Sequence, residues 1–363
     1  MRPPTPRVPT SSSTAATRCG EVMPTTRIRT GLVGFGLAGR VFHSQLLLAN
    51  DHFSLDLVAT VDPEQAAGAA TVARHVVSSF DELLAHRMEL DLVIIATPPA
   101  LHVAQARVAL AAGLAVVVDK PFTPTVAEGE ELIDLAAHRG VLLTVFQSRR
   151  WDGDFLTVRD LVTSGTLGRV HRFESAFERW QTNLRVSWHG DLSATQGGGT
   201  LYDTGAHIID QALELFGPAT LAYSRVSYLG DRSDDEAVIV LEHESGTLSY
   251  LSVSRAVGQT GPRFRVMGSE GGFVCFGVDP QEAALKAGMS PRDPAYGLTD
   301  EAHCGVVGVP GNQRPVAMRR GSYPQFYELL ADALLDGGPV PVDPHSSVEV
   351  IRLIEQAHSR ANR

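Results

Sequence analysis

The segment 31–43, GLVGFGLAGRVFH, constrains the fold more than any other part of the chain. It contains G-x-G-x-x-G as Gly34, Gly36 and Gly39, directly after an apolar strand-like run and at the start of a helix-like run. In that context the three glycines permit a tight turn, a close approach of the backbone to a pyrophosphate, and close packing of helix on strand. The helix start also offers free N–H groups and a partial positive charge. The segment therefore predicts a dinucleotide site.

Strand-like and helix-like stretches alternate from Arg27 to about Phe146. Strands are expected at Ile28–Gly34, Leu55–Asp62, Val76–Val77, Leu92–Ala96, Ala115–Val118 and Val141–Phe146, with helices between them. Such alternation is typical of a doubly wound parallel sheet. It predicts an α/β N-terminal Rossmann domain over residues 26–146.

The pattern changes after Phe146. Strands with period-2 alternation are expected at residues 169–180, Ala222–Tyr228, Ala237–His243, Gly246–Ser254, Arg263–Met267 and Gly272–Phe276. Consecutive strands of this kind favour an antiparallel sheet with one covered face. Helices are expected at Phe155–Ser164, Asp203–Phe216, Tyr323–Leu335 and Ser346–Ser359, and residues 279–320 are expected to form a long ordered loop near the active site. Residues 147–363 thus predict an α+β domain.

Composition narrows the class of protein. The chain has 363 residues, is 44% hydrophobic, and carries a formal charge of −10 without a basic cluster, so nucleic acid is not an expected partner. Apolar runs are too short for a membrane span. Three cysteines without CxxC spacing argue against a disulfide framework or zinc site and fit a reducing cytoplasm. Residues 1–25 lack a signal-peptide core and are expected to be a disordered tail, with Met23 an alternative start.

Residues from three strand ends are expected to bind the dinucleotide. Asp62 lies 23 positions after Gly39, near the spacing of the acid that binds the adenosine ribose, so NAD is favoured over NADP. Arg40 could pair with the 2′-phosphate of NADP, so NADP stays an alternative cofactor. The following residues complete the predicted cofactor contacts: Gly34, Phe35, Gly36, Leu37, Ala38, Gly39, Thr97, Pro98, His102, Asp119 and Lys120.

Two constellations predict the chemistry. Lys120 ends the strand AVVVD at the edge where cofactors bind, although a strand-end lysine can also simply reach solvent. Asp203 and His207 are four apart, which places them on one face of a helix. A carboxylate beside an imidazole can fix its tautomer and raise its basicity. A metal site, for which no clear third ligand follows, and a structural histidine are the alternatives.

These motifs together resemble the Gfo/Idh/MocA oxidoreductases. The resemblance covers nearly the whole chain from Arg27 and rests on GLVGFGLAGRVFH, IIATPPALH, VVVDKPFT, FQSRRWDGDF and GGGTLYDTGAHIIDQ. Within the family, the pattern looks most like the branch that contains scyllo-inositol dehydrogenases, which are often NADP-dependent. The family motif is usually Glu-Lys-Pro, and this chain departs from it at Asp119.

The resemblance implies roles for individual residues. Lys120 corresponds to the active-site lysine, with a peptide before Pro121 that is often cis, and Asp203 and His207 correspond to the family's Asp/His pair. Substrate is expected at Lys120, Arg150, Trp151, Asp152, Asp203 and His207, with Arg149 also lining the cleft. The family's second domain is a large, open, mostly antiparallel sheet whose face commonly packs against another subunit, which implies a homodimer or homotetramer.

The sequence thus predicts an NAD(P)-dependent dehydrogenase that acts on a secondary alcohol of a cyclic polyol or sugar. His207 is expected to be the general base, oriented by Asp203, while Lys120 holds the substrate oxygen without a metal ion. Two alternatives stay open: another enzyme of the family, such as a ketosugar reductase, and a non-catalytic dinucleotide sensor.

Overall fold

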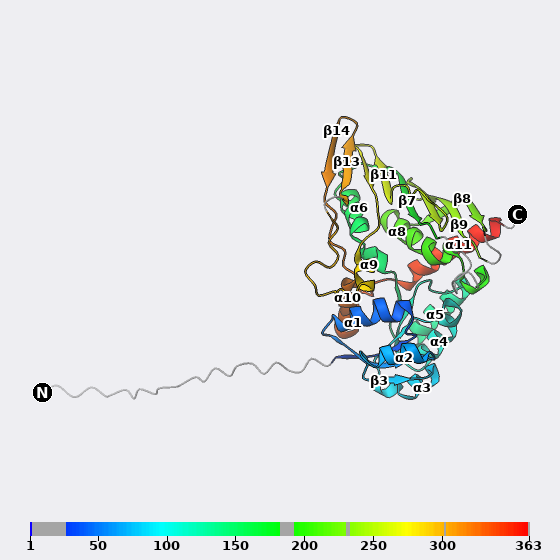
Figure 1. Ribbon diagram of the computed structural model, residues 1–363, viewed down its shortest axis with the longest axis vertical. Coiled ribbons are helices and arrows are strands. Elements are labelled where there is room, and N and C mark those ends of the chain that lie inside the picture. The colour runs from blue at the N-terminus through cyan, green and yellow to red at the C-terminus, as the bar shows by residue number, and fades with distance from the viewer. Residues whose placement is uncertain (2–26, 182–191, 230–232, 301–302, 362–363) are drawn as a thin grey trace.

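Two β-sheets organise the chain (Figure 1). The structure is a computed structural model that describes Met1 and residues 27–181, 192–229, 233–300 and 303–361. The tail predicted for residues 1–25 lies, apart from Met1, outside the described residues. Among the described helices, none is both long enough and apolar enough to cross a membrane.

The first sheet has six parallel strands in the order β3-β2-β1-β4-β5-β6. This is the doubly wound strand order, so the predicted Rossmann fold is confirmed. The strand order reverses between β1 and β4, which makes this the topological switch point of the sheet. Ligands of such sheets bind at the carboxyl ends of the strands on either side of that point. The strands are β1 (Ile28–Val33), β2 (Phe53–Ala59), β3 (His75–Val77), β4 (Leu92–Ile95), β5 (Ala115–Asp119) and β6 (Leu143–Phe146).

Local sequence signals set the helices between these strands. For example, Thr125 and Glu128 form a reciprocal capping box at the start of α5 (Val126–Arg139), and Gly140 ends it with φ of +65°. The other helical segments of this part are η1 (Ala38–His43), α1 (Ser44–Leu48), α2 (Pro63–Ala69), α3 (Phe80–Ala85), η2 (Arg87–Glu89) and α4 (Pro99–Ala111).

The second sheet has eight strands in the order β14-β13-β12-β11-β7-β10-β9-β8. β7 and β10 pair in parallel, and the other pairs in this sheet are antiparallel, which confirms the predicted mostly antiparallel sheet. The strands are β7 (Val170–Glu178), β8 (Ala219–Ser227), β9 (Glu236–His243), β10 (Leu248–Ser254), β11 (Phe264–Gly268), β12 (Gly272–Cys275), β13 (Gly305–Val309) and β14 (Asn312–Val316).

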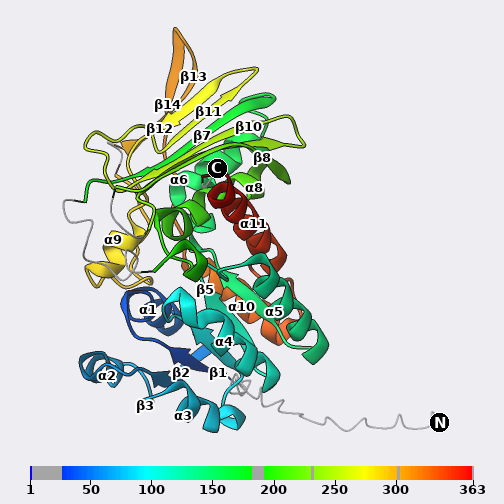
Figure 2. The same cartoon turned by 90° about the vertical axis from the view of Figure 1, so that its right-hand side faces the viewer.

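Helices fill the space between the two sheets (Figure 2). α6, α8 and α11 lie on the face of the second sheet that is turned toward the first, and α11 also packs against α5. The helical segments of this half are η3 (Ser148–Trp151), α6 (Gly153–Thr163), η4 (Ala194–Gln196), η5 (Leu201–Gly205), α8 (Ala206–Phe216), α9 (Gln281–Lys286), α10 (Pro324–Asp336) and α11 (Pro344–Ala361).

The expectation of one long loop over residues 279–320 is wrong. This region contains helix α9 and the hairpin of β13 and β14, which extends the second sheet at one edge (Figure 1). The strands escaped prediction because the outermost one, β14 with sequence NQRPV, is almost entirely exposed and includes a proline. An edge strand without a buried face carries no apolar alternation, and proline is tolerated there.

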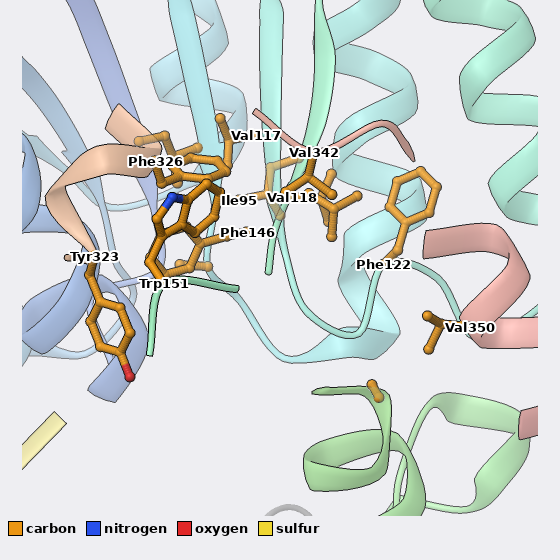
Figure 3. Close-up of a cluster of buried hydrophobic side chains, with 14 of the residues drawn as sticks. Ile95, Val117, Val118, Phe122, Phe146, Trp151, Tyr323, Phe326, Val342 and Val350 are labelled. Atoms are coloured by element: carbon orange, nitrogen blue, oxygen red, sulfur yellow. The ribbon is translucent and has the colours of Figure 1, made fainter. Parts of the chain in front are cut away.

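A buried cluster joins the end of the first sheet to the second half of the chain (Figure 3). Val117 of β5 and Phe146 of β6 lie on the side of Phe326 of α10 and Trp151 of η3, whereas Val118 points toward Val342. The ring of Phe326 meets those of Phe146 and Trp151 edge-on, at centroid distances of 4.9 and 5.8 Å. Interlocked aromatic packing of this kind resists displacement, so the carboxyl end of β5 is held rigidly.

Candidate active site

The glycine-rich turn has the shape that a pyrophosphate requires. Gly34 has φ of +91°, and a Cβ on Gly39 would lie 2.1 Å from the carbonyl oxygen of Gly34. Both positions therefore exclude larger residues. A Cβ on Gly36, in contrast, would meet no atom within 4 Å, so this glycine leaves open space beside the backbone. That space at the start of η1 fits a dinucleotide phosphate, with backbone N–H groups as its donors.

The residues between these glycines differ in what they offer a cofactor. Phe35 is buried and its ring packs against Gly68 of α2, so only its backbone can face a ligand. Leu37 is largely exposed at the turn.

Asp62 caps a helix at the carboxyl end of β2. Its Oδ1 accepts hydrogen bonds from the backbone N–H groups of Glu64 (2.8 Å) and Gln65 (3.3 Å) at the start of α2. Its Oδ2 accepts a hydrogen bond of 3.3 Å from the Gln65 side chain. The carboxylate thus lies at the edge where a ribose is expected, and it already carries out a structural task there.

The end of β4 is tied to the end of β5 by His102. Nδ1 of this buried imidazole lies 2.9 Å from the carbonyl oxygen of Pro121, and Nε2 lies 2.8 Å from that of Thr97. Both ring nitrogens therefore lie beside protein carbonyl oxygens, and a contact of His102 with a cofactor stays a prediction. Thr97 directs its hydroxyl to Gln105, and Pro98 precedes α4 at the same edge.

Lys120 meets Asp203 across more than 80 residues of sequence. Lys120 Nζ donates hydrogen bonds of 2.6 Å to Asp203 Oδ1 and 2.8 Å to the Asp203 carbonyl oxygen. An ammonium group has three N–H donors, so one remains for a substrate oxygen. The peptide between Lys120 and Pro121 is cis, as the resemblance implied.

A π-helical turn presents Asp203 and His207. Asp203 lies in η5 and His207 in the first turn of α8, which continues it. Wide turns of this kind occur often at functional sites. The glycines that precede them allow a close approach of Asp234, a residue that the sequence reasoning missed. A Cβ on Gly199 would lie 1.9 Å from Asp234 Oδ1, and Asp234 Oδ2 accepts a 2.7 Å hydrogen bond from the backbone N–H of Leu201.

His207 is held in its neutral form. Burial lowers its pKa well below the ordinary value, the charges of Lys120 and Arg149 lower it further, and Asp203 opposes them. Nδ1 is buried and has no hydrogen-bond partner among the described residues. Asp203 therefore makes no hydrogen bond to Nδ1 of His207, its carboxylate accepts from Lys120, and its orientation of the histidine stays a prediction.

Three residues expected to bind substrate are buried among protein partners. Arg150 pairs with Asp210 (2.7 Å) and Glu214 (2.9 Å), and Trp151 packs in the cluster of Figure 3. Asp152 accepts a 2.7 Å hydrogen bond from the Tyr323 hydroxyl and pairs with Arg149. In this structure the side chains of Arg150, Trp151 and Asp152 thus contact protein partners, and their contact with substrate stays a prediction. The sequence motif indicated their neighbourhood but not the direction of their side chains.

Two charged residues outside the quoted motifs reach this region. Arg179 NH2 lies 3.7 Å from Asp203 Oδ2, and Glu282 of α9 forms a 2.6 Å ion pair with Arg149. The guanidinium of Arg149 also lies over the Phe177 ring, 4.6 Å from its centroid. The alternation of β7, continued by one residue, could have indicated the direction of Arg179, whereas no sequence signal indicated Glu282. Within the described ranges, no group of three or more His, Cys, Asp or Glu side chains has the arrangement to hold a metal ion.

Comparison with known proteins fits this geometry. Residues 28–147 match the oxidoreductase family with an NAD-binding Rossmann fold, and residues 155–274 match the GFO/IDH/MocA C-terminal domain. The chain is 32% identical over 335 residues to scyllo-inositol 2-dehydrogenase (NADP(+)) IolW of Bacillus subtilis, covering 91% of this chain and 92% of the relative. It is 29% identical to D-apiose dehydrogenase of Paraburkholderia graminis, covering 72% and 71%.

A solved structure agrees with the whole arrangement. The structure of yvaA from Bacillus subtilis, described as an oxidoreductase, superposes with a TM-score of 0.87 at 31% identity and covers 94% of this chain and 97% of that one. The protein is therefore an NAD(P)-dependent oxidoreductase, as the open glycine turn, the family matches and these relatives together indicate. The chain belongs to the GFO/IDH/MocA family.

Proposed function

We propose that this oxidoreductase interconverts a secondary alcohol and a ketone on a cyclic polyol or sugar of the inositol type. The pair of Lys120 Nζ and Asp203 Oδ1, 2.6 Å apart, carries the proposal, because it places an oriented ammonium group beside a neutral histidine at the dinucleotide edge. Similarity to scyllo-inositol 2-dehydrogenase and to D-apiose dehydrogenase supports the substrate class.

The side chains divide the work of alcohol oxidation. The free N–H of Lys120 Nζ donates to the substrate oxygen and stabilises the negative charge that develops on it. His207 takes the hydroxyl proton, and Nε2 is the nitrogen left for this task because Nδ1 is buried. Asp203 keeps the ammonium group in place. When bound, the nicotinamide supplies the hydride acceptor.

A paired activity screen tests the proposal. Inositol isomers and aldoses are offered with NAD and NADP side by side, ketosugars are offered with NADH and NADPH, and turnover of at least one cyclic polyol is expected. Turnover of ketosugars alone would favour the other enzyme of the family. Tight NADH binding without turnover of any compound would favour the dinucleotide sensor.

Asp62 is proposed to select NAD through the adenosine ribose. Asp62→Ala is expected to weaken NAD binding roughly 10- to 100-fold, the range for losing hydrogen bonds to a charged group, and to change NADP binding much less because a carboxylate repels the 2′-phosphate. Dissociation constants measured for both cofactors check this result. Asp62→Ser is the control for the helix cap, since serine retains the cap but not the charge.

Ribose binding and helix capping by Asp62 predict different NAD affinities for the two variants. If Asp62 binds ribose, the alanine and serine variants lose NAD affinity alike. Wild-type NAD affinity in the serine variant, or equal weakening of both cofactors in the alanine variant, would leave Asp62 with its capping role alone.

We also propose two domains and an oligomer for this chain. Residues 26–146 form the cofactor domain and residues 147–363 the substrate domain, with a homodimer or homotetramer formed through the second sheet. The sheet's side-chain pattern supports this arrangement, because large side chains such as Tyr223 and Val238 are exposed on it. A cytoplasmic location is supported by Cys275 and Cys304, which are free thiols.

A further inference from the structure

Asp119, the residue at which the chain departs from the family's Glu-Lys-Pro motif, directs its carboxylate into the protein. Its side chain is 13% exposed. Oδ1 accepts a 2.7 Å hydrogen bond from the backbone N–H of Lys120, and Oδ2 faces His43. The carboxylate therefore holds the backbone of the residue whose ammonium group contacts Asp203.

His43 approaches Asp119 from the cofactor turn. It is the last residue of η1 and fully buried, and its Nδ1 lies 2.6 Å from the hydroxyl of Tyr327 in α10. Burial keeps the pKa of Tyr327 well above its ordinary value, so the phenol stays protonated and can donate a hydrogen bond to Nδ1. The N–H of His43 then lies on Nε2, which points toward Asp119.

The gap between His43 and Asp119 is too long for a hydrogen bond. His43 Nε2 and Asp119 Oδ2 are 3.9 Å apart, and this nitrogen has no other hydrogen-bond partner among the described residues. The interaction is thus electrostatic, between an N–H dipole and a carboxylate. A side chain one methylene longer would bring the carboxylate closer to the imidazole.

His102 completes the surroundings of the carboxylate. Its two ring nitrogens lie within hydrogen-bond distance of the carbonyl oxygens of Pro121 and Thr97, on either side of the site, and a neutral imidazole donates to one of them. Burial lowers the pKa of His102, and the negative charge of Asp119 opposes that change without reversing it. Burial alone would raise the pKa of Asp119, but His43, Lys120 and His102 outweigh it, so the carboxylate stays ionised.

We propose that Asp119 is a positioning residue that fixes Lys120 and links it, through His43 and Tyr327, to the glycine-rich turn that binds the cofactor. This inference rests on the proposed function for the role of Lys120. His43 lies in the same short helix as Gly39, so a shift of this helix on cofactor binding changes the distance from His43 to Asp119. A movement of the Asp119 carboxylate also moves Lys120, because the backbone N–H of Lys120 donates a hydrogen bond to that carboxylate.

Enzyme kinetics of two variants separate positioning by charge from simple packing. Asp119→Asn is expected to lower kcat about tenfold or more, the scale for a lost charged hydrogen bond, and to change the polyol KM and the NADH Kd less than about threefold. Asp119→Glu is expected to retain kcat within about threefold because the carboxylate is kept and can reach His43. A packing role predicts the reverse order, since asparagine matches the shape of aspartate while glutamate overfills a buried site.

The lysine content of the chain permits a second readout that needs no substrate. Lys120 and Lys286 are the only lysines, so NMR of protein labelled with ¹³C at lysine Cε reports Lys120, with the Glu282-bonded Lys286 as an internal control. NADH is expected to move the Lys120 signal in the wild type. In Asp119→Asn the Lys120 signal is expected to be displaced before NADH is added, with the Lys286 signal unchanged.

Tyr327→Phe covers the case in which Asp119→Asn does not fold, because it removes a single hydroxyl. It is expected to displace the Lys120 signal in the same direction by a smaller amount. Wild-type Lys120 signals in both variants, or full kcat in Asp119→Asn with loss in Asp119→Glu, would overturn the proposal. If no polyol is turned over, the proposed function fails while the NMR experiment still decides the role of Asp119.

Discussion

Lys120→Met is expected to lower kcat for polyol oxidation about 10³-fold, within the range for loss of an oxyanion donor or of acid–base catalysis. Methionine has a similar length, so the packing of the stem is largely kept while the ammonium group is lost. Asp203 retains Arg179 as a neighbour of opposite charge, which limits the damage to the surrounding site. The glycine turn lies on other strands, so the Kd of NADH is expected to change less than about threefold.

Steady-state kinetics and NADH fluorescence titration check this result. Lys120→Arg is the matched control, because it keeps the positive charge but replaces a compact ammonium group with a planar guanidinium. We expect it to recover only a small part of the activity. A methionine variant with more than about a tenth of the wild-type kcat would show that Lys120 is not the donor to the substrate oxygen.

His207→Asn is expected to lower kcat for oxidation about 10²- to 10³-fold, since a general base contributes on this scale. The pH profile adds a sharper signature. Because the pKa of His207 lies well below its ordinary value, the imidazole remains a base as the pH falls below 6.5. Wild-type activity should therefore persist into mildly acidic solution, decline only when His207 becomes protonated, and lose this acid limb in the variant.

His243→Asn provides a matched control for the pH profile. His243 is also buried with a lowered pKa, but its ring nitrogens contact the carbonyl oxygen of Gly217, at the end of α8, and the hydroxyl of Ser249 in β10. Its replacement is expected to leave the acid limb in place. An acid limb that persists in His207→Asn, or moves in His243→Asn, would contradict the assignment of His207 as the base.

The sequence predicted those features that depend on local pattern. The glycine turn, the buried strands of the first sheet, and the strand end at Lys120 each carry a signal within about a dozen residues. The four-residue spacing of Asp203 and His207 also indicated that they share a face. Their position beside Lys120 was expected from the family resemblance, because no local pattern relates residues that far apart.

Features that depend on long-range partners could not be read in this way. The three glycines before Leu201 indicated a close contact, but only the fold shows that Asp234 fills it. The ion pair of Arg150 with Asp210 and the hydrogen bond of Asp152 with Tyr323 could not be predicted, because these partners are distant in sequence. Asp119 likewise acquires meaning only when η1 and α10 bring His43 and Tyr327 to it.

Transfer of deuterium from a polyol carbon to the nicotinamide is the most direct measurement of the proposed reaction. Wild-type protein is incubated with NAD or NADP and with carbon-deuterated inositol isomers or aldoses, and the cofactor is analysed by mass spectrometry. We expect a reduced cofactor one mass unit heavier than that formed from unlabelled polyol, and no transfer in Lys120→Met. Tight cofactor binding with no deuterium transferred from any of these compounds would contradict a polyol dehydrogenase.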